Sequence, residues 1–171
     1  MDDDARRSRL EALFSAHGRT VLAYARRRTD HATAEDVLSD VFMVAWRRLD
    51  DMPADALPWL LACARGALAN HRRAERRRLR LIARLRPTVA DQLPGLSDRR
   101  LACALAQLRA SDREALLLSA WEGLATEQAA VVLGCSPQAF RVRLHRARKR
   151  LALALAAPDA ATPMTMEARH D

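Results

Sequence analysis

The chain has 171 residues, of which 50% are hydrophobic and 29% are charged, and its formal net charge at pH 7 is +8. This length allows one mid-sized domain or two small ones, and the apolar fraction is sufficient to build folded cores. No run of 18 apolar residues occurs, and no apolar segment follows the charged start, so we expect neither a membrane span nor a leader peptide, but a cytoplasmic protein without membrane insertion. The three cysteines, Cys63, Cys103 and Cys135, have the spacing of neither a zinc site nor a disulfide, and we expect no metal site.

The composition predicts an all-α protein. Ala, Leu and Arg dominate the sequence, aromatic residues make up only 4%, and no segment alternates apolar and polar residues as strands do. Apolar residues recur with helical spacing in three N-terminal segments, which are predicted as helices over residues 10–28, 33–49 and 58–86. Thr33 is expected to cap the second of these helices.

The composition changes between residues 87 and 97, where two prolines and one glycine occur without helical periodicity. Such a segment is typical of a linker between domains. We therefore predict two small helical domains joined by a flexible linker, at residues 5–86, 87–97 and 98–155, followed by a disordered tail at residues 156–171. Within the second domain, Ser111 and Glu114 have the spacing of a capping box and are expected to open a helix.

Residues 126–151 have the pattern of a helix-turn-helix unit. A short helix over residues 126–133 is predicted to end at a turn that contains Gly134, and Ser136 is expected to cap a second helix. The apolar stripe of that second helix consists of Phe140, Leu144, Ala147 and Leu151. Its opposite side is polar and basic, which is the shape needed to enter the major groove of DNA.

The outward side of this second helix carries the residues that we expect to contact DNA. Gln138 and Arg141, near its N-terminus, have the hydrogen-bonding groups that read adenine and guanine respectively. The basic residues further along, from Arg146 to Lys149, are placed to bind phosphates. The alternative is an ordinary solvated helix in an arginine-rich protein. His145 has no His or Cys partner at helical spacing, so DNA contact or plain exposure explains it better than metal binding.

A second basic segment lies at residues 65–86, which hold nine arginines and one glutamate. Like charges this close repel one another, so the arrangement costs stability unless an anion is bound. The apolar stripe that precedes the segment leaves Arg65, Arg72, Arg73 and Arg76 on a common outward side. Phosphate binding is therefore favoured over the alternative, a solvated helix face.

The second predicted helix has an outer face with two acidic residues. Asp36, Asp40, Met43 and Arg47 follow one another at helical spacing, on the side away from its buried positions. This is either a solvated face, on which Asp36 serves the helix dipole, or a surface that docks on another protein, and the residues alone leave both open. No set of carboxylate, His or Cys residues in the sequence suits a catalytic centre, so we predict a binding protein that is not an enzyme and needs no cofactor.

Three segments of the sequence carry a family resemblance. AEDVLSDVFMVAWR (34–47) and PWLLACARGALANHRR (58–73) resemble region 2 of the bacterial RNA polymerase sigma factors of the extracytoplasmic-function (ECF) type. REALLLSAWEGLATEQAAVVLGCSPQAFRVRLHRARKRL (113–151) resembles their region 4. The resemblance covers about residues 10–153. It implies an alternative sigma factor, a dissociable subunit that binds core RNA polymerase and directs promoter-specific transcription initiation.

The resemblance implies roles for residues at matching positions. Docking on the clamp helices of core RNA polymerase is expected of Asp36, Ser39, Asp40, Met43 and Arg47. Opening and reading of the −10 promoter element is expected of Arg65, Asn70, Arg72, Arg73, Arg76 and Arg77. Reading of the −35 element by the helix-turn-helix is expected of Ser136, Gln138, Arg141, Val142, His145, Arg146, Arg148 and Lys149. The resemblance also implies contact with the polymerase flap and, as a further partner, an anti-sigma factor that holds the protein inactive.

Three positions depart from the family pattern. Ser39 stands where Gln is usual, which weakens one expected contact with the clamp. Gly66 and Asn70 stand where Asn and Asp are usual in the helix that reads the −10 element, and Gly66 also lowers helix propensity. An unusual −10 sequence is therefore expected.

Two other classes of function compete with a sigma factor. A free-standing helix-turn-helix repressor or activator would explain residues 111–151 equally well, but it leaves the basic segment at 65–86 and the acidic face without a role. An enzyme that acts on nucleic acid would need a metal-binding cluster, and the sequence offers none.

Overall fold

In the computed structural model, which describes residues 3–82 and 98–156, every regular element is a helix. The first half of the chain forms α1 (Asp3–Arg26), α2 (His31–Arg47), the short 3-10 helix η1 (Leu49–Asp51) and α3 (Ala56–Ile82). The second half forms α4 (Arg99–Gln107), α5 (Ala110–Ala120), α6 (Thr126–Leu133) and α7 (Pro137–Ala156). The prediction of an all-α chain is confirmed. The predicted linker and residues 157–171 lie outside the described residues, whereas residue 156, which the prediction places in the tail, is the last residue of α7.

The cap of α2 differs from the prediction, because Asp30 and not Thr33 occupies that position. The Thr33 N–H donates to Asp30 Oδ1 at 3.0 Å, and Thr33 Oγ1 donates to Asp30 Oδ2 at 2.8 Å. These hydrogen bonds favour the ionised carboxylate and lower the pKa of Asp30. Aspartate caps a helix at least as well as threonine does, so the helix starts at the earlier of the two capping residues.

The predicted capping box of Ser111 and Glu114 is wrong. The helix α5 begins at Ala110, and the residue before it, Arg109, makes no side-chain cap hydrogen bond. The carboxylate of Glu114 instead accepts hydrogen bonds from Tyr24 and Arg28 in the other half of the chain. A capping box would offer this carboxylate one backbone N–H, whereas the distant site offers it the opposite charge of Arg28 together with the Tyr24 hydroxyl.

The helix-turn-helix is confirmed in detail. The helix α6 ends at Leu133 and is capped by Gly134, whose φ of +63° lies in the left-handed region that favours glycine. The Ser136 Oγ accepts a hydrogen bond from the Ala139 N–H at 3.2 Å and so caps α7. Three of the four predicted stripe residues, among them Phe140 and Leu144, are buried, and they hold α7 on α5 and α6.

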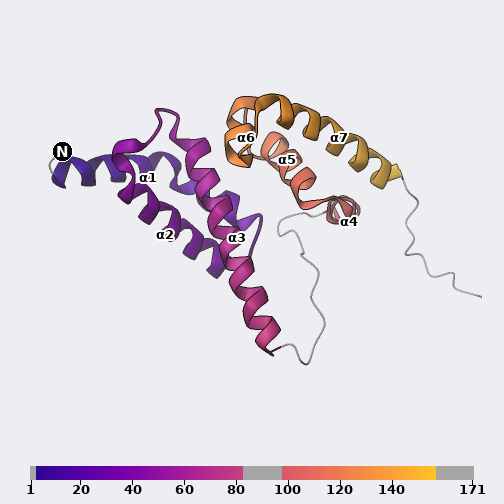
Figure 1. Ribbon diagram of the computed structural model, residues 1–171, viewed down its shortest axis with the longest axis horizontal. Coiled ribbons are helices and arrows are strands. Elements are labelled where there is room, and N and C mark those ends of the chain that lie inside the picture. The colour runs from indigo at the N-terminus through magenta and orange to yellow at the C-terminus, as the bar shows by residue number, and fades with distance from the viewer. Residues whose placement is uncertain (1–2, 83–97, 157–171) are drawn as a thin grey trace, which may run out of the picture.

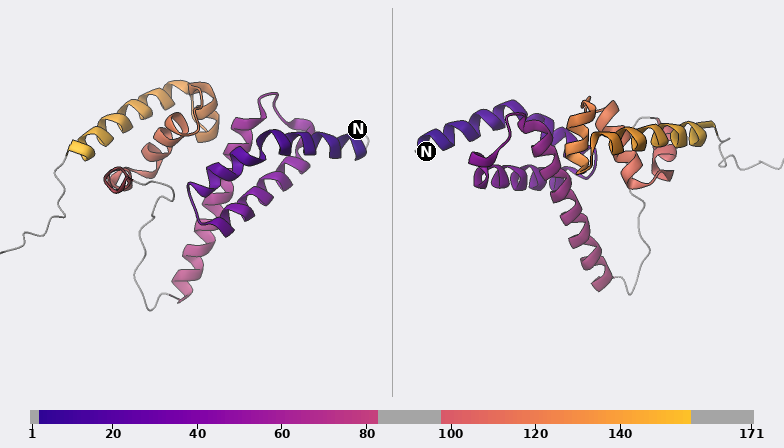
Figure 2. Two further views of the ribbon diagram at one scale, coloured as in Figure 1. Left: turned by 180° about the vertical axis from the view of Figure 1, so that it is seen from behind. Right: turned by 45° about the horizontal axis from the view of Figure 1, so that its top comes forward.

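The two halves of the chain pack against each other. In Figure 1 and in both views of Figure 2, α3 lies between α1 and α2 on one side and α4 to α7 on the other. The helix α6 contacts α3 directly, and the buried apolar residues of both halves form one continuous core. The C-terminal part of α3 projects away from both halves (Figure 1). This arrangement leaves one basic helix, α7, on the outside and places the first part of the other, α3, at the junction.

Candidate nucleic-acid interface

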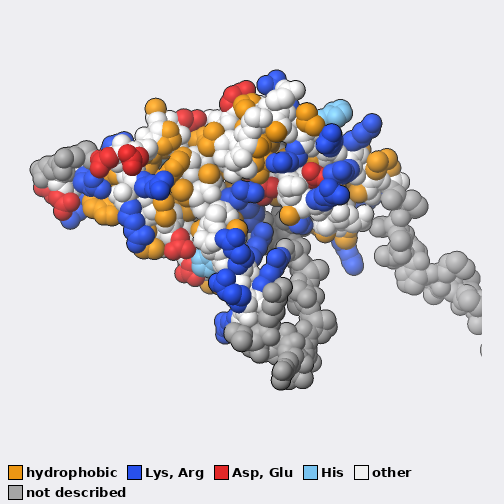
Figure 3. Space-filling view, viewed as in Figure 1, with side chains coloured by type: hydrophobic (Ala, Val, Ile, Leu, Met, Phe, Trp, Pro, Cys, Tyr) orange, Lys and Arg blue, Asp and Glu red, His pale blue; other side chains and the backbone are white. Residues whose placement is uncertain are grey.

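The outward side of α7 carries all the residues predicted to read the −35 element. Every one of them is exposed: Ser136, Gln138, Arg141, Val142, His145, Arg146, Arg148 and Lys149. Figure 3 shows Lys and Arg side chains gathered over α7. Because the apolar stripe holds the opposite side of the helix, these side chains are free to approach a nucleic acid without any rearrangement of α7.

A basic groove lies between the start of α5 and the outward side of α7. Arg109 and Ser111 from the α5 side and Arg143 from α7 line it together with several of the residues named above. On one side of the groove, Arg150 of α7 forms an ion pair with Asp112 of α5, whose side chain is only 8% exposed. This pair fixes the position of α7 on α5. The sequence predicted no role for either residue, since their separation of 38 positions follows no helical spacing.

The predicted −10 residues lie on one exposed side of α3. All six are exposed: Arg65, Asn70, Arg72, Arg73, Arg76 and Arg77. Those on the projecting part of α3 contribute to a second cluster of Lys and Arg side chains in Figure 3. Three of the six are already engaged within the chain, since Arg72 Nη2 donates to the Arg28 carbonyl oxygen at 3.0 Å and Arg73 Nη2 donates to Asn70 Oδ1 at 2.5 Å.

The face predicted to dock on core RNA polymerase lies along α2. Asp36, Ser39, Met43 and Arg47 are exposed and Asp40 is half-buried. Met43 is 50% exposed, which is high for a large apolar side chain and fits a surface that another protein covers. The face meets α3 at Asp40, whose Oδ2 lies 3.2 Å from His71 Nε2.

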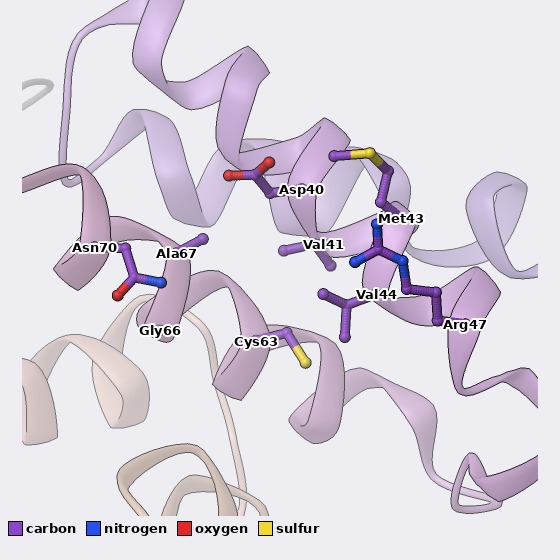
Figure 4. Close-up of a pocket in the computed structure, with 9 residues that line it drawn as sticks. All are labelled: Asp40, Val41, Met43, Val44, Arg47, Cys63, Gly66, Ala67 and Asn70. Carbon is purple, nitrogen blue, oxygen red and sulfur yellow. The ribbon is translucent and has the colours of Figure 1, made fainter. Parts of the chain in front are cut away.

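A hollow of about 390 Å³ opens between this face and α3 (Figure 4). Asp40, Met43 and Arg47 line it from α2, and Cys63, Gly66 and Asn70 line it from α3, together with Val41, Val44 and Ala67. A Cβ atom at Gly66 would meet nothing within 4 Å, so the space beside this glycine is open. Burial raises the pKa of the Cys63 thiol, and the positive charge of Arg48 opposes this only in part. The structure thus brings residues of the predicted docking face and of the predicted −10 helix around one cavity.

A buried ionic cluster joins the two halves of the chain. Arg28, whose side chain is 4% exposed, donates from Nε to Glu114 Oε2 at 3.1 Å and from Nη1 to Glu122 Oε1 at 3.0 Å. Glu122, whose side chain is 1% exposed, also accepts from Arg27 Nη2 at 2.5 Å. The Tyr24 hydroxyl donates to Glu114 Oε1 at 2.7 Å, and the Arg28 guanidinium lies 3.6 Å from the Tyr24 ring centroid. We call these five residues the junction cluster.

The junction cluster changes the acid–base properties of its members. Burial raises the pKa of Tyr24 well above its ordinary value of about 10, and the negative charge of Glu114 raises it further. For Arg28, burial opposes the charged form, but Tyr24, Glu114 and Glu122 outweigh burial and raise the pKa. Sequence analysis missed this cluster because its partners are 86 to 95 residues apart and each half shows only ordinary charged residues.

The described residues include no helix that is long and apolar enough to cross a membrane. Within those same residues, no three His, Cys, Asp or Glu side chains are grouped as metal ligands would be.

Comparison with protein families matches both halves of the chain. Residues 13–78 match the family Sigma-70 region 2, and residues 98–151 match the family Sigma-70, region 4. The first match includes α2 and most of α3, and the second includes α4 to α6 and most of α7. The two matches divide the chain at the segment predicted as a linker.

Individual relatives agree with the family matches. The ECF RNA polymerase sigma factor SigL of Mycobacterium tuberculosis is 32% identical over 157 residues, which are 85% of this chain and 88% of SigL. "Probable RNA polymerase sigma factor RfaY" of Xanthomonas campestris is 34% identical over 142 residues, and this chain spans only 35% of its length. The sigma factor RpoE of Bartonella quintana, solved in complex with the anti-sigma factor NepR, is 26% identical with a TM-score of 0.66 over 85% of this chain and 95% of that one. The chain therefore belongs to the sigma-70 family, as an RNA polymerase sigma factor of the ECF type.

Proposed function

We propose that this protein acts in the cytoplasm, binds core RNA polymerase through α2, reads the −35 element with α7, and opens and reads the −10 element with α3. The observation that carries the proposal is the presence on one chain of two exposed basic helices and a third exposed face. A repressor needs only α7, the recognition helix of the helix-turn-helix. A subunit that places polymerase on a promoter needs all three surfaces.

The assignment of α7 rests on its geometry. Gln138 and Arg141 lie near the N-terminus of a capped helix whose opposite side is held in the core, which is how recognition helices present side chains to base edges. A bidentate contact from arginine to guanine, or from glutamine to adenine, contributes about 1–3 kcal/mol of discrimination. Arg146, Arg148 and Lys149 follow one to two turns later, where they can bind phosphates.

The assignment of α3 rests on charge and on the hollow of Figure 4. The arginines of α3 lie on one exposed side and fit a phosphate backbone. Beside them, the hollow lined by Gly66 and Asn70 offers space for part of an unpaired base from the opened strand. Gly66 and Asn70 are the two departures from the family pattern in this helix, so we expect the preferred −10 sequence to be unusual.

The assignment of α2 rests on exposure. Asp36, Ser39, Met43 and Arg47 form a continuous outward face that no described part of the chain covers. Core RNA polymerase is the partner that the sigma family implies for this face, and the flap is the partner implied for the second half. The solved relative RpoE is bound to the anti-sigma factor NepR, and we extend this class of partner to the present chain.

Co-elution with core RNA polymerase tests the proposal. The wild type and a variant that carries Asp36→Arg and Asp40→Arg are each mixed with core enzyme and separated by size. We expect the wild type to join the core enzyme and the variant to remain free, because reversed charges placed opposite a complementary surface cost several kcal/mol.

The control carries two charge reversals elsewhere, Asp4→Arg and Glu11→Arg on α1, both at exposed positions. It should bind core enzyme like the wild type. If neither the wild type nor the control joins the core enzyme, while both still bind duplex DNA, the sigma-factor assignment is wrong and a free-standing helix-turn-helix regulator takes its place.

A further inference from the structure

The basic groove between α5 and α7 holds arginines that lie outside the set predicted to read the −35 element. There are three of them: Arg109, Arg143 and Arg150. Four residues of the predicted set line the same groove: Ser136, Gln138, Val142 and Arg146. The groove encloses about 580 Å³ and is therefore continuous with the surface that we assign to DNA.

The groove is positively charged, because its carboxylate is already paired. Asp112 is the one acidic residue among the described residues that line it, and its side chain is only 8% exposed and accepts a hydrogen bond from Arg150. The Arg150 side chain is 45% exposed, so the rest of its guanidinium can still contact a ligand. Arg109 is exposed, and its side chain makes no hydrogen bond or ion pair with any described residue. Guanidinium groups with free N–H donors in one groove fit the oxygens of a phosphate.

Helical periodicity places these arginines on one flank of α7. Each residue turns an α-helix by about 100°, so Arg148 and Arg150 lie about 200° apart around the helix. Arg143 precedes Arg150 by two turns and lies on the same flank, where Arg109 joins it from the start of α5. Arg148, which we assign to phosphate binding, is exposed on the other flank and does not line the groove.

The dimensions of DNA give each flank a partner. The major groove is about 12 Å wide, which is about the width of a helix with its side chains. A recognition helix in the groove therefore has the phosphate backbone of one strand beside one flank and that of the other strand beside the other flank. Since the groove between α5 and α7 adjoins the base-reading side of α7, a phosphate backbone fits it better than an acidic protein segment does.

We propose that the groove between α5 and α7 is a second phosphate site, at which Arg109, Arg143 and Arg150 bind the DNA strand opposite the one that Arg148 contacts. The inference rests on the −35 function proposed above for α7. It adds a contact from α5, which lies outside the helix-turn-helix, and so fixes how α7 is turned within the major groove. Asp112 acts as a positioning residue, because it holds Arg150 beside α5.

Arg109 offers the most direct test, because it is exposed and lies on the α5 side of the groove. A duplex that binds the full chain tightly is first selected from a library of random sequences, and affinities are then measured over a range of salt concentrations. We expect Arg109→Ala to weaken binding to this duplex and to its single-base variants by the same factor. The slope of log affinity against log salt should fall by about one. Arg109→Lys, which keeps the charge, should keep the slope.

The matched control is Arg9→Ala, which removes an exposed arginine from the N-terminal part of α1, far from α7 (Figure 1). It should bind the duplex like the wild type. Circular dichroism checks that each variant keeps its helices. If Arg109→Ala does not, Arg109→Gln, which keeps a long polar side chain, replaces it in the same measurements.

Neutral methylphosphonate groups, placed at one backbone position of the selected duplex at a time, locate the contact. Each group removes one phosphate charge and should weaken binding of the wild type wherever an arginine contacts that phosphate. The weakening at one position should disappear in Arg109→Ala. The weakening at a position on the other strand should disappear in Arg148→Ala.

The proposal is supported if Arg109→Ala lowers the salt slope and the positions coupled to Arg109 and Arg148 lie on different strands. It is overturned if Arg109→Ala binds like the control, as expected of a groove that serves an acidic protein segment. It is also overturned if no position is coupled to Arg109, or if both positions lie on one strand. Failure to select any duplex would reject the −35 function of α7 together with this inference, whereas a selected duplex without coupling to Arg109 rejects this inference alone.

Discussion

The two basic helices of this protein, α7 and α3, carry the same kind of charge but differ in how closely other helices pack around them. The apolar stripe of α7 and the ion pair of Arg150 with Asp112 hold this helix on the rest of the domain, and its outward side stays exposed. The helix α3 is packed on three sides near its start, by α1, α2 and α6, and its Arg72 is bonded to the backbone after α1. Only the C-terminal part of α3 projects freely (Figure 1).

The comparison teaches that a basic segment in a sequence indicates what a helix can bind, but not when it can bind. In α7 the charges are available in the arrangement described. In α3, Arg65 lies close enough to the junction cluster for its charge to act on the Tyr24 phenol. The packing around α3 depends on Arg28, Glu114 and Glu122, whereas α7 is exposed. Substitutions at these three residues should therefore change stability, and substitutions on the outward side of α7 should change DNA binding.

The largest effect is expected from Arg28→Ala, which removes the charged partner of the mostly buried Glu114 and leaves Glu122 paired with Arg27 alone. Breaking a buried pair by removing one partner costs about 3–5 kcal/mol. We expect the free energy of unfolding, measured with urea, to fall by that amount. Arg26→Ala, at a more exposed arginine two residues earlier, should change it by less than about 0.5 kcal/mol. An equal loss in both variants would show that Arg28 contributes no more to the free energy of unfolding than an exposed arginine does.

A smaller effect, confined to α7, is expected from Arg141→Ala. The variant should lose about 1–3 kcal/mol of discrimination at one base position of the upstream element and keep its stability, because Arg141 is exposed and makes no described contact. Binding to duplexes that differ at single base pairs measures this. Equal losses on every duplex would mean that Arg141 contacts phosphate and reads no base.

The chain contains a single tyrosine, so its ultraviolet titration reports the junction directly. In the wild type we expect Tyr24 to ionise well above pH 10, because burial and Glu114 raise its pKa. The folded-state pKa lies above the unfolded value, so this group stabilises the fold fully below about pH 10 and its contribution is lost as the pH rises through the folded-state pKa. Glu114→Gln should lower the pKa of Tyr24 toward its ordinary value. An unchanged titration would contradict the hydrogen bond between the two side chains.

The smallest effect is expected from Lys149→Ala on α7. A lysine that binds only phosphate should weaken binding to all duplexes alike and lower the slope of log affinity against log salt by about one. The free energy of unfolding of the variant should be unchanged, since Lys149 is exposed. A loss that depends on the sequence of the duplex would instead make Lys149 a base-reading residue.

Much of this fold follows from local sequence. The helix-turn-helix follows from Gly134, Ser136 and the spacing of Phe140 and Leu144, each of which acts within one or two turns of chain. The errors have a common physical cause. Short patterns predict Thr33 and Ser111 as caps, whereas Asp30 is the stronger acceptor at the first helix and Glu114 accepts from a distant guanidinium instead of a local N–H.

The candidate site likewise combines features that local sequence predicts with features that depend on tertiary packing. The exposure of the α7 residues and of the α2 face follows from helical periodicity, which is local. The junction cluster could not be predicted, because Arg28 meets Glu114 and Glu122 only after two helices of one half have packed against those of the other. The hollow between Asp40 and Gly66 likewise depends on the packing of α2 on α3.

The most direct test of the central claim is transcription by core RNA polymerase and this protein from a library of random promoter sequences, with sequencing of the templates that yield RNA. The account predicts that two short elements are enriched at a constant separation, and that Arg141→Ala weakens selection of the upstream element alone. Transcription that does not depend on the protein, or enrichment of one palindromic element without transcription, would contradict it.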